Sequence, residues 1–182
     1  MKLKTGDIFL TDSQAGYAIV VKFLMQAPTV WLWLWRKIFG GQNKVRYYHA
    51  GMIYDFATLI EQQKIVEKDS VQTLEGKKVI FWRKKHLTVG QATKLQMLSE
   101  EDLGKGYDVK LIFGKTLTWL TGIKWFQRKL QSPGKEICVT RVAYWYSQIG
   151  VTFGQKNYMD CTTDIIDDYC QAHPDEWEEV TE

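Results

Sequence analysis

A histidine and a glutamate on either side of a predicted turn are the first residues in this sequence that could act together. His49 lies in the predicted strand Tyr47–Tyr54, and Glu61 lies in the predicted strand Thr58–Val66. Each is six residues from Asp55, so a hairpin centred on the turn Asp55-Phe56-Ala57 places them directly opposite each other. A carboxylate there accepts the imidazole N–H and fixes its tautomer. The simpler alternative is a cross-strand pair without chemistry, and a register shift of one residue would separate the two side chains.

Cys138 could supply a nucleophile for that histidine. It stands at the start of a predicted helix, residues 138–149, shortly after the loop signal Ser132–Lys135. A helix N-terminus stabilises a thiolate, and its free N–H groups can bind an oxyanion. A thiol needs a nearby base to attack a carbonyl at neutral pH, and His49 would be that base. The alternative for a lone cysteine is a small buried hydrophobic side chain.

The other cysteines and the metal-binding patterns offer weaker chemistry. Three cysteines without a Cys-x-x-Cys pair do not form a disulfide framework and are typical of a reducing compartment. Cys161 and Cys170 lie in acidic surroundings, which disfavour a thiolate. A zinc site built from His49, Glu61 and Cys138 is chemically feasible, but no metal-ligand spacing supports it. Since no Gly-rich nucleotide-binding motif is present either, we expect no metal and no cofactor.

The composition is that of one folded domain with an uneven charge. Of 182 residues, 45% are hydrophobic and 14% aromatic, which is enough for a large core. Residues 1–141 hold 23 basic and 12 acidic side chains, whereas residues 142–182 hold one and nine. A basic body with an acidic end could meet an anionic surface, or the two parts could neutralise each other within the fold.

We find no targeting or membrane-spanning segment in the sequence. Gly6-Asp7 interrupts the first apolar stretch, so no signal peptide is apparent. The most apolar stretch, residues 17–39, is broken by Lys22, Gln26 and Pro28, which argues against a spanning helix. We therefore expect a cytoplasmic protein, with contact to a membrane surface as an open alternative.

Two aromatic segments remain without a role. Trp31–Trp35 alternates tryptophan with leucine, so as a strand it would place three tryptophans on one face. Between Lys110 and Lys129, aromatic side chains interleave with basic ones. This run could stack on single-stranded nucleic acid, could lie on an anionic membrane, or could be a core helix with a basic edge. We favour the core helix and expect no nucleic-acid partner.

The rest of the pattern predicts strands in the middle of the chain and helices towards both ends. The helix Thr88–Leu98 would turn Val89, Ala92 and Leu95 inwards. The other elements expected are strands at Ile8–Leu10, Val71–Leu74 and Lys78–Arg83 and a helix at Ala18–Met25. This order is typical of an α+β fold rather than of alternating βαβ units.

The motifs, taken in order, resemble a known family. They are Gly6-Asp7-Ile-Phe-Leu, His49-Ala-Gly-Met-Ile, Leu59-Ile-Glu61, Gly106-Tyr107-Asp108, and Cys138 ahead of an apolar helix. This set is similar to that of the permuted papain-like amidases, the YiiX/YaeF-like hydrolases of the NlpC superfamily. The resemblance covers roughly residues 5–165. It departs from the family at Cys138-Val139-Thr140-Arg141, where the family often has Cys-Ser-Glu-Leu.

The resemblance implies a fold and a set of roles. The fold would be a circularly permuted papain-like domain over residues 1–182, with an antiparallel barrel-like sheet packed against helices and an acidic C-terminal tail from about residue 167. Cys138 would be the nucleophile, His49 the general base and Glu61 its orienting partner. Tyr107 would line the pocket, and Arg141 would either alter substrate choice or mark a diverged site.

These observations together predict a cysteine hydrolase that cleaves an amide bond, in a peptide or an N-acyl compound, through a thioester. The amide class comes from the resemblance alone. One alternative is a lipid-directed thioesterase or acyltransferase that uses the same site, with the Trp-rich segments at a membrane. Another is a non-catalytic binding module on a decayed hydrolase fold. The expected partner is a peptide-like or acylated small substrate.

Overall fold

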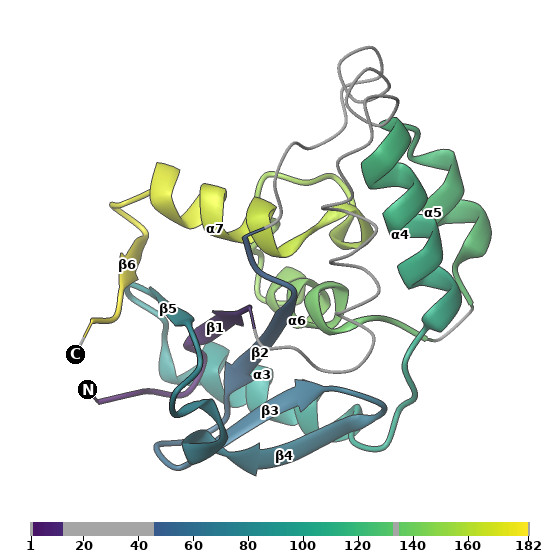
Figure 1. Cartoon of the computed structure of the whole chain (residues 1–182). Coiled ribbons are helices and arrows are strands. Elements are labelled where there is room, and N and C mark those ends of the chain that lie inside the picture. The colour runs from purple at the N-terminus through teal and green to yellow at the C-terminus, as the bar shows by residue number, and fades with distance from the viewer. Residues whose placement is uncertain (1, 13–45, 133–134, 182) are drawn as a thin grey trace.

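The fold is an open antiparallel sheet with helices packed against it (Figure 1). The computed structural model describes residues 2–12, 46–132 and 135–181. Its six strands lie in the order β4-β3-β2-β1-β5-β6. They are β1 Ile8–Thr11, β2 His49–Ile53, β3 Thr58–Gln62, β4 Val66–Ser70, β5 Val79–Lys84 and β6 Trp177–Glu179. Because β4 and β6 form the two edges among the described strands, the described part of the sheet is open and does not show the barrel-like closure that the resemblance implied.

Five α-helices and two short 3₁₀ helices complete the described part of the chain. The α-helices are α3 Val89–Glu101, α4 Val109–Thr121, α5 Trp125–Leu130, α6 Cys138–Ser147 and α7 Thr163–Ala172. The 3₁₀ helices are η1 Val71–Leu74 and η2 Tyr158–Asp160. The α+β class expected from the sequence is therefore confirmed.

The hairpin of β2 and β3 forms as predicted, but its register differs. The Asp55 carboxylate accepts hydrogen bonds from the N–H groups of Ala57 and Thr58, at 2.9 and 2.8 Å. The turn is centred one residue later than expected, so Gly51 rather than His49 lies opposite Glu61. His49 and Glu61 become diagonal neighbours, which keeps them on the same face because the shift is two residues.

Other local predictions were wrong for identifiable reasons. Val71–Leu74 forms η1 instead of a strand, because the Ser70 side chain caps it by accepting from the N–H of Gln72. The predicted strand Thr58–Val66 is divided between β3 and β4. Val89 is 84% exposed, because it occupies the first turn of α3 beyond the Thr88 cap, whereas Leu95 is fully buried.

The sheet separates two apolar clusters. On one side, Ile8 and Leu10 of β1 join the larger cluster, which includes the buried faces of α6 and α7. On the other side, Phe9 joins a smaller cluster with Leu59 and Phe81. The alternation along β1 follows from the two-residue period of a strand. As a result α6, which carries Cys138, is packed directly on the central strands.

The acidic residues after position 160 form part of this fold. Arg46, just before β2, pairs with Asp167 at 2.8 Å and with Asp168. Asp167 also accepts a hydrogen bond from the Trp82 indole at 2.8 Å. Beyond α7, β6 pairs with β5, and its Trp177 is 1% exposed. The segment from about residue 167, expected as a tail, is thus integrated into the sheet and the core.

The aromatic and basic run after Lys110 forms two packed helices. Gly114 of α4 makes the close approach of α5 feasible, since a Cβ there would lie 2.8 Å from the Cα of Gln127. Gly122 ends α4 with a φ of 75°. Three expectations, for Ala18–Met25, Trp31–Trp35 and the Pro133-Gly134 break, fall outside the described residues.

Candidate active site

The candidate site lies where the N-terminus of α6 meets the start of β2. Along His49–Met52, β2 pairs with β1, but its ladder with β3 begins only at Gly51. The edge of β2 at His49 and Ala50 therefore lies outside that ladder, and α6 packs against β2. This break in the pairing provides the place where a helix terminus can approach a strand backbone.

The diagonal pair of His49 and Glu61 is in direct contact. His49 Nε2 lies 2.5 Å from Glu61 Oε2, and both side chains are buried. The second carboxylate oxygen, Oε1, accepts from the Gln63 side chain at 2.7 Å. Burial opposes ionisation of Glu61, but the hydrogen bond and the charge of His49 lower its pKa. A charged carboxylate therefore fixes one imidazole nitrogen and leaves Nδ1 for another partner.

That other partner is Cys138, the first residue of α6. Burial disfavours the charged imidazole, yet the negative Cys138 and Glu61 outweigh it and raise the pKa of His49 to about 10. Burial likewise opposes the Cys138 thiolate, but the charge of His49 lowers the thiol pKa. The two shifts have one cause, since each group stabilises the charged form of the other. The arrangement favours a thiolate–imidazolium pair.

Two further donors act on the same sulfur. The Tyr107 hydroxyl lies 3.7 Å from Cys138 Sγ, and the backbone N–H of Ala50 also lowers the pKa of Cys138. Burial and the negative charge of Cys138 raise the pKa of Tyr107 well above its usual value, so its hydroxyl keeps its proton and can donate. The sequence pointed to Tyr107 through the motif Gly106-Tyr107-Asp108, but nothing in it indicated Ala50.

The start of α6 is held by its own backbone and a threonine. The Thr140 hydroxyl accepts from the N–H of Ile137 at 3.1 Å. The first N–H groups of a helix have no acceptor within it, so the start of α6 presents backbone donors beside the sulfur, and that of Cys138 interacts with the Tyr107 hydroxyl. This is the geometry in which a helix N-terminus can hold an oxyanion beside a nucleophile.

Arg141, which departs from the family pattern, is bound within the protein. It is 3% exposed, and its Nη1 donates to Asp102 at 3.0 Å. Its Nε lies 3.5 Å from Glu136 Oε2. Asp102 also accepts from the Trp145 indole at 2.9 Å. Arg141 therefore joins α6 to the end of α3 through buried carboxylates, and its expected effect on substrate choice stays a prediction.

The remaining two cysteines have the opposite electrostatic setting. Burial raises the pKa of Cys161 to about 11, although Lys115 opposes the shift. Burial and the charge of Asp167 raise the pKa of Cys170 strongly.

Within residues 2–12, 46–132 and 135–181, no cluster of three or more His, Cys, Asp and Glu side chains could hold a metal ion. His49, Glu61 and Cys138 are brought together, but not as a metal-binding cluster.

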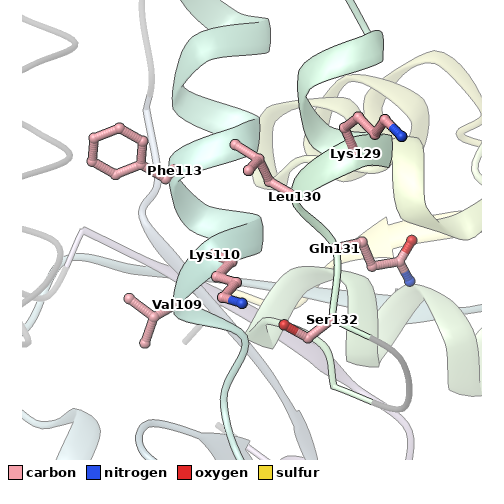
Figure 2. Close-up of a pocket in the computed structure, with 7 residues that line it drawn as sticks. All are labelled: Val109, Lys110, Phe113, Lys129, Leu130, Gln131 and Ser132. Atoms are coloured by element: carbon pink, nitrogen blue, oxygen red, sulfur yellow. The ribbon is translucent and has the colours of Figure 1, made fainter.

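A cavity of about 510 Å³ lies on α4 and the end of α5, and none of His49, Glu61 and Cys138 lines it (Figure 2). Its lining combines apolar and basic side chains: Val109, Lys110, Phe113, Lys129, Leu130, Gln131 and Ser132. Phe113 is 62% exposed.

The helices of the described ranges include none with the length and apolar character needed to cross a membrane.

One solved structure has a fold similar to that of this chain. It is the crystal structure of the metalloprotein yiiX from Escherichia coli O157:H7, DUF1105, with a TM-score of 0.58. The fold is similar to that of yiiX. The match covers 100% of this chain and 98% of that chain, at 17% sequence identity, so the likeness concerns the fold alone. No protein-family model matches the chain, and no curated protein matches it.

Proposed function

We propose that the protein is a cysteine hydrolase of acyl bonds with a permuted papain-like active site. The observation that carries the proposal is the buried contact of Glu61 with His49, together with the effect of His49 in lowering the pKa of Cys138, the first residue of α6. A buried thiol whose pKa is lowered by a histidine, and a carboxylate on the same histidine, are the components of an activated thiol nucleophile. The YiiX-like fold agrees with this assignment.

The reaction follows from the positions of these groups. The Cys138 thiolate attacks the carbonyl carbon and forms a C–S bond, while the carbonyl oxygen becomes an oxyanion near the first N–H groups of α6. The His49 imidazolium gives its proton to the leaving amine, and the C–N bond breaks to leave a thioester. His49 then takes a proton from water, which attacks the thioester. The C–S bond breaks, and the acid and the thiolate are released.

Residue-resolved alkylation tests the nucleophile without knowledge of the substrate. At pH 6.5, iodoacetamide should modify Cys138 at least about tenfold faster than free cysteine, since the thiol pKa is lowered. Cys161 and Cys170, whose pKa values are raised, should stay unmodified in the same sample. Loss of hydrolysis of a panel of amide and ester compounds in folded Cys138→Ala would complete the test. A Cys138 no faster than free cysteine would support the binding-module alternative instead.

A second candidate function directs the same residues at acyl lipids. The α4–α5 region favours it, because Phe113 and Trp125 are 62% and 58% exposed beside Lys110 and Lys129. Exposed aromatic and basic side chains bind anionic interfaces. Flotation with vesicles containing phosphatidylserine should then recover the wild type but not the double variant F113S/W125S. Absence of wild-type protein from the floated fraction would contradict this candidate.

A further inference from the structure

A buried glutamine beside the proposed acid holds the segment that carries Tyr107. Gln62, the last residue of β3, is 1% exposed, and its Nε2 donates to the backbone carbonyl of Gly106 at 3.0 Å. The N–H of Tyr107 donates to the carbonyl of Lys64 at 3.0 Å, in the turn between β3 and β4. The peptide unit that joins Gly106 to Tyr107 is therefore held at its oxygen by a side chain and at its N–H by the backbone.

Tyr107 is also bonded to the segment that leads into α6. It forms an isolated parallel bridge with Glu136, and the N–H of Asp108 donates to the Glu136 carbonyl at 2.9 Å. The Tyr107 hydroxyl lies 3.7 Å from Cys138 Sγ. Tyr107 thus lies between the β3–β4 turn and the start of α6, and each step from Gln62 to the sulfur is a covalent bond or a direct contact.

The amide of Gln62 is only half satisfied. Its Oε1 is buried and has no hydrogen-bond partner in the described part of the chain. Burying an unpaired polar atom lowers stability, so packing alone does not explain a glutamine at this position. What the amide adds is the bond to the Gly106 carbonyl. A polar group retained at such a cost beside a reactive centre is typical of a functional constraint.

We propose that Gln62 is a positioning residue that holds Tyr107 so that its hydroxyl donates to the Cys138 sulfur. The inference rests on the proposed function, because it concerns the same nucleophile. Burial opposes the Cys138 thiolate and His49 is the main group that lowers the thiol pKa, with the hydroxyl of Tyr107 as a smaller contribution. Without the bond from Gln62, the Gly106 carbonyl is free to turn and the hydroxyl moves away from the sulfur, so the thiol pKa rises.

Strand β3 would then support the nucleophile through two successive residues. Side chains that follow one another along a strand point to opposite faces, so the two have different partners. Glu61 contacts the imidazole of His49, and Gln62 contacts the carbonyl before Tyr107. One short strand thus positions both a base and a hydroxyl donor beside the same sulfur.

The pH profile of Cys138 alkylation by iodoacetamide tests this role. In Gln62→Met, which keeps the side-chain length but removes the donor, the rate at pH 6.5 should fall about three- to fivefold, as expected for loss of one hydrogen bond to the sulfur. The acid limb should move to higher pH, and the rate should equal that of the wild type on the high-pH plateau, where both thiols are ionised. A purely structural change, which alters access to the sulfur, would lower the rate by the same factor at every pH and would contradict the proposal.

A double-mutant cycle shows whether Gln62 acts through Tyr107. Tyr107→Phe should lower the rate at pH 6.5 about fivefold, since the hydroxyl is absent. Q62M/Y107F should react at the same rate as Tyr107→Phe, because no hydroxyl is left to position. Effects of the two changes that multiply, or an unchanged rate in folded Gln62→Met, overturn the inference.

Gln127→Met is the matched control. Gln127 is also buried, at 5% exposed, and its Nε2 donates to Asp160, so the variant removes a buried amide bond elsewhere in the fold. Its rate of Cys138 alkylation should change less than about twofold, since distant sites act independently. Far-UV circular dichroism checks the fold of each variant, and Gln62→Leu takes the place of Gln62→Met if the latter does not fold.

The same experiments separate the two proposals. If wild-type Cys138 reacts no faster than free cysteine, the hydrolase proposal fails and the role of Gln62 fails with it. If Cys138 reacts rapidly and Tyr107→Phe slows it, but Gln62→Met does not, the hydrolase proposal stands and the role of Gln62 is wrong.

Discussion

Cys138 and Cys170 are both buried residues on helices, yet their thiols are in opposite electrostatic states. Cys138 begins α6 and Cys170 lies near the end of α7, and they are 3% and 0% exposed. Burial opposes the thiolate at both positions. At Cys138 the charge of His49 reverses that effect, whereas at Cys170 the charge of Asp167 adds to it. Burial without a nearby cation thus raises the thiol pKa and favours an inert cysteine. A positive charge held beside the buried sulfur lowers the thiol pKa and favours a reactive one.

Removing the cation should make Cys138 resemble Cys170. In His49→Ala, the rate of Cys138 alkylation by iodoacetamide at pH 6.5 should fall about a hundredfold, because burial then raises the thiol pKa without opposition. Peptide mass spectrometry after timed quenching measures the rate at each cysteine, and far-UV circular dichroism checks the fold. A fall of less than threefold would show that His49 does not set the state of the sulfur.

A smaller loss should follow removal of the carboxylate behind the histidine. In Glu61→Gln, the charge that helps to raise the pKa of His49 is absent, so the imidazolium and its thiolate partner are both less stable. Since the Cys138 pKa then rises, the acid limb of its alkylation profile should move to higher pH, with a rate about tenfold lower at pH 6.5. Gln63→Ala, which removes only the donor to Glu61 Oε1, should change that rate less than threefold.

The smallest effect on the sulfur is expected from Arg141. Because the guanidinium pairs with Asp102 and Glu136, Arg141→Met should change Cys138 alkylation less than twofold. It should instead lower the free energy of unfolding in urea by about 3 kcal/mol, since buried Glu136 loses its cation and buried Asp102 keeps only Lys105. A change in alkylation above fivefold with normal stability would place Arg141 at the substrate after all.

Local patterns were sufficient to predict where His49, Glu61 and Cys138 lie in their elements, whereas the meeting of Cys138 with His49 was expected from their chemistry and from the family resemblance. A two-residue period in strands and the start of an apolar helix put His49 and Glu61 on one face and Cys138 at a helix N-terminus. The register was wrong by two residues, because the contacts of Asp55 within the turn set its centre. The catalytic roles remain a proposal.

Contacts between distant segments could not be predicted in this way. Lys115 donates to the carbonyl of Cys161 across 46 residues, and this contact depends on how α4 packs against the segment after η2. Neither the hydrophobic periodicity of a helix or strand nor a short motif shows which distant segments of the chain come into contact. The same holds for the open sheet, because its edges depend on β6 joining β5 from the far end of the described chain.

The position of β6 also has a consequence for when the site can be assembled during translation. Trp177 packs against Tyr146 of α6 and against Phe153, with ring centroids 5.8 and 5.6 Å apart. The helix that presents the sulfur is therefore fully supported only after residue 177 has left the ribosome. A nascent chain that already contains Cys138 but not Trp177 would therefore have an incomplete core beside α6.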